Sequence, residues 1–82
     1  METETVSQVT DIIAKALGLP PGSVKEADTI DSFEAWDSLG HLGILTALDK
    51  VFSGRVAGVP GLAKATSVKA ILVLLQEHRI IA

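Results

Sequence analysis

Residues 36–42 read Trp36-Asp37-Ser38-Leu39-Gly40-His41-Leu42 and open the apolar pattern at the centre of the chain. From residue 37 to residue 52 the sequence fits one helix of 3.6 residues per turn. At that period a single stripe of the helix collects His41, Ile44, Leu45, Leu48, Val51 and Phe52. We expect this stripe to face the core, which makes the segment the central helix of the fold.

The other two faces of this predicted helix differ in character. One face carries Ser38, Leu42, Thr46 and Asp49, with Leu39 at its edge. The other face is almost without side chains, because it is formed by Gly40, Gly43 and Ala47. Each helical glycine costs roughly 0.5–1 kcal/mol relative to alanine. Close approach by another chain, a neighbouring helix or a ligand would offset that cost, but a frayed helix start would also tolerate the glycines.

A first helix is predicted upstream of this segment. Its apolar residues recur at steps of three and four, at Val6, Val9, Ile12, Ile13, Ala16 and Leu17. Gly18 stands where a helix commonly ends in a left-handed residue. Pro20 and Pro21 follow, and neither can donate a hydrogen bond to a continuing helix. The first helix is therefore expected to end near Gly18.

The segment between the two helices, residues 22–36, lacks a helical period and predicts a long loop. Its apolar residues can anchor it to the core, and they are Val24, Ile30, Phe33 and Trp36. Between Glu26 and Asp37 the chain has five acidic residues and no basic one. These acids are either an ordinary solvated loop or an acidic surface beside Ser38, and the sequence favours neither interpretation.

The last third of the chain predicts one further helix. Ser53-Gly54 ends the central helix, and residues 55–65 form a glycine-rich connection in which residues 61–65 could make a short helical turn. Thr66 or Ser67 can cap the last helix. The apolar residues of that helix are Val68, Ile71, Leu72 and Leu75. The sum is an all-α fold, a small three-to-four-helix bundle of one domain over residues 1–82, with a long loop between helices 1 and 2.

The composition excludes several classes of protein and site. The chain has no cysteine, so disulfides, thiolate metal sites and cysteine nucleophiles are excluded. Nucleic-acid binding normally needs a dense basic face, whereas the net charge here is −3. The longest apolar run, residues 70–75, is far shorter than the roughly 18 residues of a membrane span. The acidic N-terminus lacks the apolar stretch of a secretory signal, and we expect a cytoplasmic, monomeric protein.

Asp37, Ser38 and His41 are the residue types of a hydrolase triad, but their spacing does not suit one. Ser38 and His41 could touch across one helical turn. The aspartate must contact the far side of the histidine, and Asp37 is poorly placed for this because it adjoins the serine. We therefore expect no enzyme activity and place His41 at the rim of the core as a hydrogen-bonded residue. His78, the second histidine, lies far away in the sequence, so no metal site is expected.

Asp37-Ser38 at a helix start suits chemistry that another protein performs on the serine. The first-turn amides and the positive end of the helix dipole favour a phosphodiester there by about 0.3–1 kcal/mol at an exposed position. An ordinary serine cap would share these local features, so the pair alone is a weak signal.

The wider setting of the serine resembles the acyl carrier protein family. The Asp-Ser-Leu signature of that family is Asp37-Ser38-Leu39 here, within residues 36–42, and the run Ala47-Leu48-Asp49-Lys50-Val51-Phe52 continues the likeness. The resemblance extends over almost the whole chain, up to Thr66-Ser67-Val68 at the start of the last helix. It implies the bundle of helices described above.

The resemblance also implies a function. Ser38 would receive 4′-phosphopantetheine from coenzyme A through a magnesium-dependent phosphopantetheinyl transferase. The thiol of that group would carry acyl or aminoacyl groups as thioesters between the ligase and transferase enzymes of a biosynthetic pathway. Asp37 would assist the transferase reaction, and Leu39 and Leu42 would contact partner enzymes. The alternative is an unmodified helical protein-interaction module in which Ser38 acts only as a helix cap.

The chain departs from the fatty-acid carriers of this family, which bear several acids along the helix after the serine. The comparable positions here include Gly43, Lys50 and Val51, and only Asp49 is acidic. The form of residues 36–42 is more similar to stand-alone carriers of polyketide, nonribosomal-peptide or cell-surface-modification pathways.

Three regions are expected to contact partner enzymes on this interpretation. The first is the small-residue face at Gly43, and the second is Asp49. The third is the acidic loop before the serine, which includes Asp31 and Glu34. The aliphatic core could also hold a cargo pocket, although Phe52 and the leucines could equally fill it.

Overall fold

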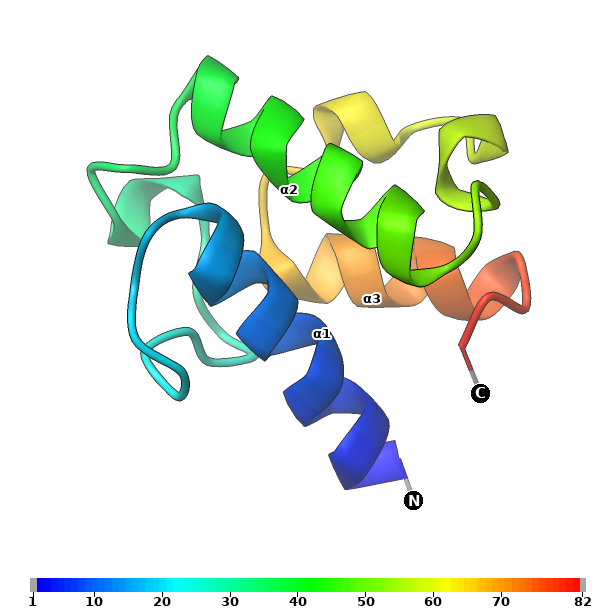
Figure 1. Cartoon of the computed structure of the whole chain (residues 1–82), viewed down its shortest axis with the longest axis horizontal. Coiled ribbons are helices and arrows are strands. Elements are labelled where there is room, and N and C mark those ends of the chain that lie inside the picture. Colours follow the sequence, from blue (N-terminus) through cyan, green and yellow to red (C-terminus); the bar gives the residue numbers. More distant parts are fainter. Residues whose placement is uncertain (1, 82) are drawn as a thin grey trace.

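Three α-helices form the fold, and the computed structural model describes the chain over residues 2–81, with side chains from residue 5 onward. The helices are α1 (Glu2–Ala16), α2 (Ser38–Val51) and α3 (Val68–Glu77). Single-turn 3₁₀ helices lie between them, at Ile30–Ser32, Val56–Gly58 and Leu62–Lys64. Figure 1 shows α1 and α2 packed together in front of α3. The prediction of a small all-α bundle with a long first loop is confirmed.

α1 ends near Gly18, as the sequence predicts. The buried residues of α1 and of the turn after it are Val9, Ile13, Ala14 and Leu17. Gly18 adopts a left-handed φ of +75°, and its amide donates to the Lys15 carbonyl at 3.1 Å. The Leu19 amide donates to the Ala14 carbonyl at 2.8 Å. These two bonds form a Schellman motif, which satisfies carbonyls at the end of the helix and turns the chain into the loop.

α2 buries one stripe, but the stripe is narrower than predicted. His41, Ile44 and Leu48 are buried, whereas Val51 is 46% exposed, so its predicted place in the core is wrong. Because successive helical residues turn by 100°, Val51 lies at the edge of the stripe, beside the face of Ala47. At the C-terminal end of α2 this edge opens onto the space between α1 and α2.

The long loop between α1 and α2 is tied to the body of the protein at several points. Its anchors Val24 and Trp36 are buried, and Ile30 and Phe33 are half-buried, as the sequence predicts. An isolated antiparallel bridge pairs Thr29 with Ser67. The Ile30 amide donates to the Thr66 carbonyl at 2.8 Å, and the Val68 amide donates to the Asp28 carbonyl at 3.0 Å. The loop is therefore latched to the start of α3.

α3 completes the core with the residues that the sequence predicts. Its buried side chains are Val68, Ile71, Leu72 and Leu75. Of the two candidate caps, Ser67 is the one used, because its hydroxyl oxygen accepts from the Ala70 amide at 3.1 Å. The short turn expected within residues 61–65 is the 3₁₀ helix Leu62–Lys64, whereas the 3₁₀ helix Val56–Gly58 was not predicted.

Candidate functional site

Asp37, and not Ser38, caps α2. The Asp37 backbone is extended, with φ −113° and ψ −164°, and its Oδ1 accepts from the Gly40 amide at 2.8 Å. Ser38 is the first residue of the helix and is exposed. The expected role of Ser38 as the helix cap is therefore wrong, because the Asp37 carboxylate one residue earlier occupies that position. The protein-interaction module of which that cap was a part stays an alternative.

The Ser38 hydroxyl does not take part in the hydrogen bonds that form the helix start. It makes no hydrogen bond within the part of the chain that the structure describes. The backbone around it is nevertheless fixed, since the Trp36 amide donates to the Phe33 carbonyl at 3.1 Å and the His41 amide donates to the Asp37 carbonyl at 2.8 Å. A free hydroxyl thus stands on a rigid helix start.

His41 ties this helix start to the core. It is 7% exposed, and its Nδ1 accepts from the Trp36 indole Nε1 at 3.0 Å. Its Nε2 lies 2.9 Å from the Leu62 carbonyl oxygen, which can only accept. Nδ1 must accept and Nε2 must donate, so the geometry selects the neutral tautomer with the proton on Nε2. His41 is the hydrogen-bonded residue of the core rim that the sequence predicts, and it has no nitrogen left for Ser38.

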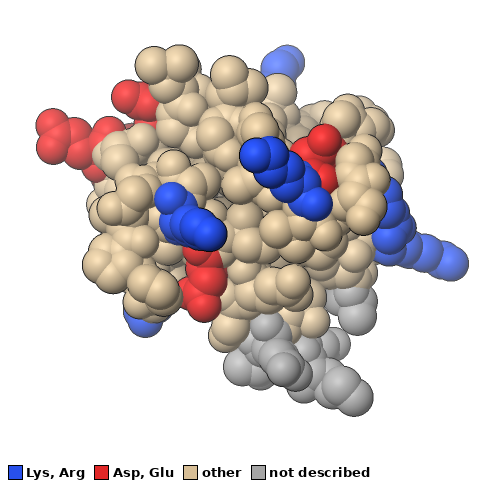
Figure 2. Space-filling model, viewed as in Figure 1, with Lys and Arg blue, Asp and Glu red and all other residues tan. Residues whose placement is uncertain are grey.

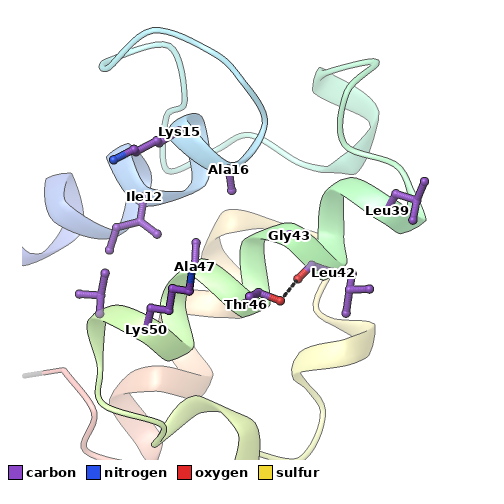
Figure 3. Close-up of a pocket in the computed structure, with 10 residues that line it drawn as sticks. Ile12, Lys15, Ala16, Leu39, Leu42, Gly43, Thr46, Ala47 and Lys50 are labelled. Carbon is purple, nitrogen blue, oxygen red and sulfur yellow. Dashed lines mark hydrogen bonds between the residues drawn. The ribbon is translucent and has the colours of Figure 1, made fainter.

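Two leucines project into solvent beside Ser38. Leu39 is 79% exposed and Leu42 is 60% exposed, and as neighbours at positions i and i+3 of the helix they form an exposed apolar pair. They follow the serine by one and four residues, so Leu42 shares its face. The Thr46 hydroxyl continues this face and donates to the Leu42 carbonyl at 2.9 Å (Figure 3). The positions expected to contact partner enzymes are available for such contacts.

The two helical glycines have different surroundings. A β-carbon on Gly40 would collide with the Ala35 carbonyl oxygen and would lie 3.1 Å from Leu17 Cδ2. A β-carbon on Gly43 would meet only the Ala16 carbonyl oxygen, at 3.8 Å, which is an ordinary contact. Packing of the loop and of the end of α1 therefore explains Gly40. It does not explain Gly43, whose partner role stays a prediction.

Gly43 lies in a groove between α1 and α2, with a volume of about 720 Å³ (Figure 3). α1 contributes Ile12, Lys15 and Ala16, and α2 contributes Gly43, Ala47, Lys50 and the exposed apolar residues at positions 39, 42 and 51. The groove begins beside Ser38 and continues along α2. The contribution of α1 could not be predicted from the sequence, because the period of a helix does not show which of its half-buried residues face another helix.

The acidic residues predicted to bind partners have unequal surroundings. Asp49 is half-buried, and its Oδ1 accepts from the Ala57 amide at 2.9 Å, so it holds the connection after α2. Asp28 accepts from the Lys25 amide at 2.7 Å. Glu26, Asp31 and Glu34 are exposed. Figure 2 shows acidic side chains at the upper left, over the loop that leads into α2, and basic side chains over the middle of the same face, where acidic side chains lie beside them.

Comparisons with known proteins assign the chain to no family. No family model matches it, and no curated protein or solved structure is significantly similar to it. Within residues 2–81 no helix is long and apolar enough to cross a membrane. Among the side chains of residues 5–81, no three of histidine, cysteine, aspartate or glutamate lie together as a metal site would require.

Proposed function

We propose that the protein is a carrier whose Ser38 receives 4′-phosphopantetheine from coenzyme A. The observation that carries this proposal is the exposed Ser38 hydroxyl, free of hydrogen bonds within the described residues, on the first residue of a 14-residue helix. Asp37 supplies the cap, so the serine can be modified without loss of the helix start.

The helix start also suits the charge of the attached group. The first amides of an α-helix have no intrahelical acceptor, and here the Gly40 amide bonds Asp37 Oδ1 while the His41 amide bonds the Asp37 carbonyl. The amides of Ser38 and Leu39 remain for the anionic oxygens of a phosphodiester. At an exposed position this interaction contributes about 0.3–1 kcal/mol.

In the proposed transfer, this chain supplies Ser38 as the nucleophile, and Asp37 assists the transferase reaction. Ser38 Oγ attacks the phosphorus next to the pantetheine of coenzyme A, forming a phosphodiester as the bond to adenosine 3′,5′-bisphosphate breaks. The proton of the hydroxyl would pass to a base on the transferase, and the magnesium ion of that enzyme would supply positive charge for the departing phosphate. When bound, the group supplies a thiol on a flexible arm, which holds acyl or aminoacyl groups as thioesters. A sequence without cysteine depends on that arm for its only thiol.

Partner enzymes would dock around the serine. Leu39 and Leu42 offer apolar contacts, and Asp31 and Glu34 offer charge for basic patches on the partners. These partners would be the phosphopantetheinyl transferase and the ligases or transferases that load and unload the arm. We propose that the carrier itself is not an enzyme and acts as a monomer in the reducing cytoplasm, which suits a sequence without cysteine.

Loading of Ser38 is the first prediction. The protein is incubated with coenzyme A, magnesium and a broad-specificity phosphopantetheinyl transferase, and intact mass is measured. We expect one pantetheinyl adduct on the wild type and none on Ser38→Ala. Ser7→Ala, which changes another exposed serine on α1, is the matched control and is expected to load like the wild type. A wild type without adduct, or an adduct that survives Ser38→Ala, would contradict the carrier function.

The exposed acids of the loop provide the second prediction. We expect the triple variant Glu26→Gln, Asp31→Asn and Glu34→Gln to be loaded about three- to tenfold more slowly at low salt, because each exposed ion pair contributes up to about 1 kcal/mol. Asp28 is left unchanged because its carboxylate holds the Lys25 amide. The measurement is the initial loading rate at limiting protein. An equal decrease for Glu77→Gln, at the far end of α3, would rule out a specific role of the loop.

A further inference from the structure

The groove between α1 and α2 gathers most of the exposed large apolar side chains of the described residues. These side chains are Leu39, Leu42, Val51 and Val73, and the first three line the groove. Exposed apolar residues scattered singly are ordinary on a protein surface, but a contiguous apolar surface marks a binding site. The groove is such a surface.

The floor of the groove is formed by small residues, which would allow another helix to lie close to α1 and α2. Ala16, Gly43 and Ala47 form it, so backbone and small side chains lie where bulky ones would otherwise stand. Packing inside the protein does not require a glycine at position 43, since a β-carbon there would make only an ordinary contact. From Leu39 to Lys50 the groove follows twelve residues of α2, a rise of about 16 Å. This length equals about three turns of a second helix.

The charge of the groove is opposite to that of the protein. Its charged lining residues are Lys15 on α1 and Lys50 on α2, on opposite sides of the groove in Figure 3. Among the described side chains, no acidic one lines it. The chain as a whole has a net charge of −3. Lys50 stands at the end of the groove away from Leu39 and Leu42. One end is therefore apolar and lies near Ser38, and the other end is basic.

We propose that this groove binds an amphipathic helix of a partner protein, with apolar residues on one face and acidic residues flanking that face. The apolar residues would pack over Gly43 and Ala47 between the exposed leucines and Ile12, at the i, i+3, i+4 and i+7 spacing of helix-in-groove recognition. The acidic residues would pair with Lys15 and Lys50. This interaction goes beyond the carrier function, because it requires no group on Ser38.

Synthetic peptides test the proposal on the unmodified full-length protein. Two peptides of about four helical turns carry leucines at the above spacing. One is flanked by glutamates and the other by lysines. At low salt, fluorescence anisotropy is expected to show about fivefold tighter binding of the glutamate-flanked peptide, from two exposed ion pairs. The largest changes in backbone amide chemical shift on peptide binding are expected around Gly43 and Ala47.

Charge reversal supplies the matched control. The variant Lys15→Glu with Lys50→Glu is expected to reverse the preference between the two peptides. The variant Lys64→Glu with Lys69→Glu, which changes two exposed lysines away from the groove, is expected to keep it.

Four results would overturn the proposal. The first is equal binding, or absence of binding, of the two peptides. The second is a set of NMR shifts outside the groove. The third is displacement of the bound peptide by decanoate at a lower concentration than that at which the peptide itself binds. The groove would then bind a small acyl anion. The fourth is concentration-dependent self-association, measured by sedimentation, that the variant Lys15→Glu with Lys50→Glu abolishes. The groove would then bind a second copy of this chain.

Discussion

Replacing Gly40 by alanine is expected to lower the free energy of unfolding by about 1–3 kcal/mol, which is the cost of overpacking a filled site. In an unhindered helix the same change raises stability by roughly 0.5–1 kcal/mol. The sign differs here because the new β-carbon would collide with the Ala35 carbonyl oxygen, which belongs to the backbone and cannot rotate away. Relief of the clash would move the residues that lead into Ser38.

Gly43→Ala is the matched control, since its β-carbon would make only an ordinary contact with the Ala16 carbonyl oxygen, at 3.8 Å. We expect it to gain the usual roughly 0.5–1 kcal/mol. Urea denaturation followed by the fluorescence of Trp36, the single tryptophan, measures both variants. If both alanine variants are stabilised to the same extent, the tight packing of Gly40 against the loop is wrong.

Replacing His41 by leucine is expected to cost roughly 2–4 kcal/mol of stability. Leucine keeps most of the apolar volume but leaves both the Trp36 indole N–H and the Leu62 carbonyl without the partner they have now. A buried polar group without a partner costs about 1–3 kcal/mol. A domain of this size rarely has more than about 3–5 kcal/mol in total, so we expect a large unfolded fraction at 25 °C.

His78→Leu is the control for the loss of His41, because His78 is exposed at the C-terminal end of α3. It is expected to change stability by less than about 0.5 kcal/mol. The His41→Gln variant retains a donor for the Leu62 carbonyl, while its amide oxygen is the only acceptor that it can offer the Trp36 indole, in a geometry unlike that of the imidazole. We expect an intermediate stability and an upfield shift of the Trp36 indole proton. Equal stabilities for His41→Leu and His78→Leu would contradict the role of this network.

The sequence predicts those parts of the fold that depend on neighbours along the chain. The four buried residues of α3 follow from its period alone, and the end of α1 follows from Gly18 and the prolines. The position of Ser38 beside two apolar residues is equally local. Of the two possible caps of α3, Ser67 and Thr66, the sequence could not choose, because both side chains can accept from a helix amide.

Features that join distant segments could not be predicted. The Leu62 partner of His41 is 21 residues away in the sequence, and the Ala57 amide that Asp49 accepts from is eight residues away. The exposure of Val51 depends on how far α1 extends across α2. The spacing of apolar residues within each helix does not predict how the two helices are placed. The groove has the same origin, since it exists only once the two helices are placed.

The two hydrogen bonds that latch the first loop to α3 affect the order in which parts of the protein fold. These backbone bonds join Asp28 to Val68 and Ile30 to Thr66, so they close loops of 68 − 28 = 40 and 66 − 30 = 36 residues. Such long closures form late, because the chain loses the entropy of the whole intervening segment before the bonds compensate for it. On the ribosome the latch cannot close until residues 66–68 have emerged. A nascent or truncated chain without α3 therefore lacks the two bonds that hold the first loop. If the proposed carrier function holds, we expect a transferase to load Ser38 more slowly on such a chain than on one that includes α3.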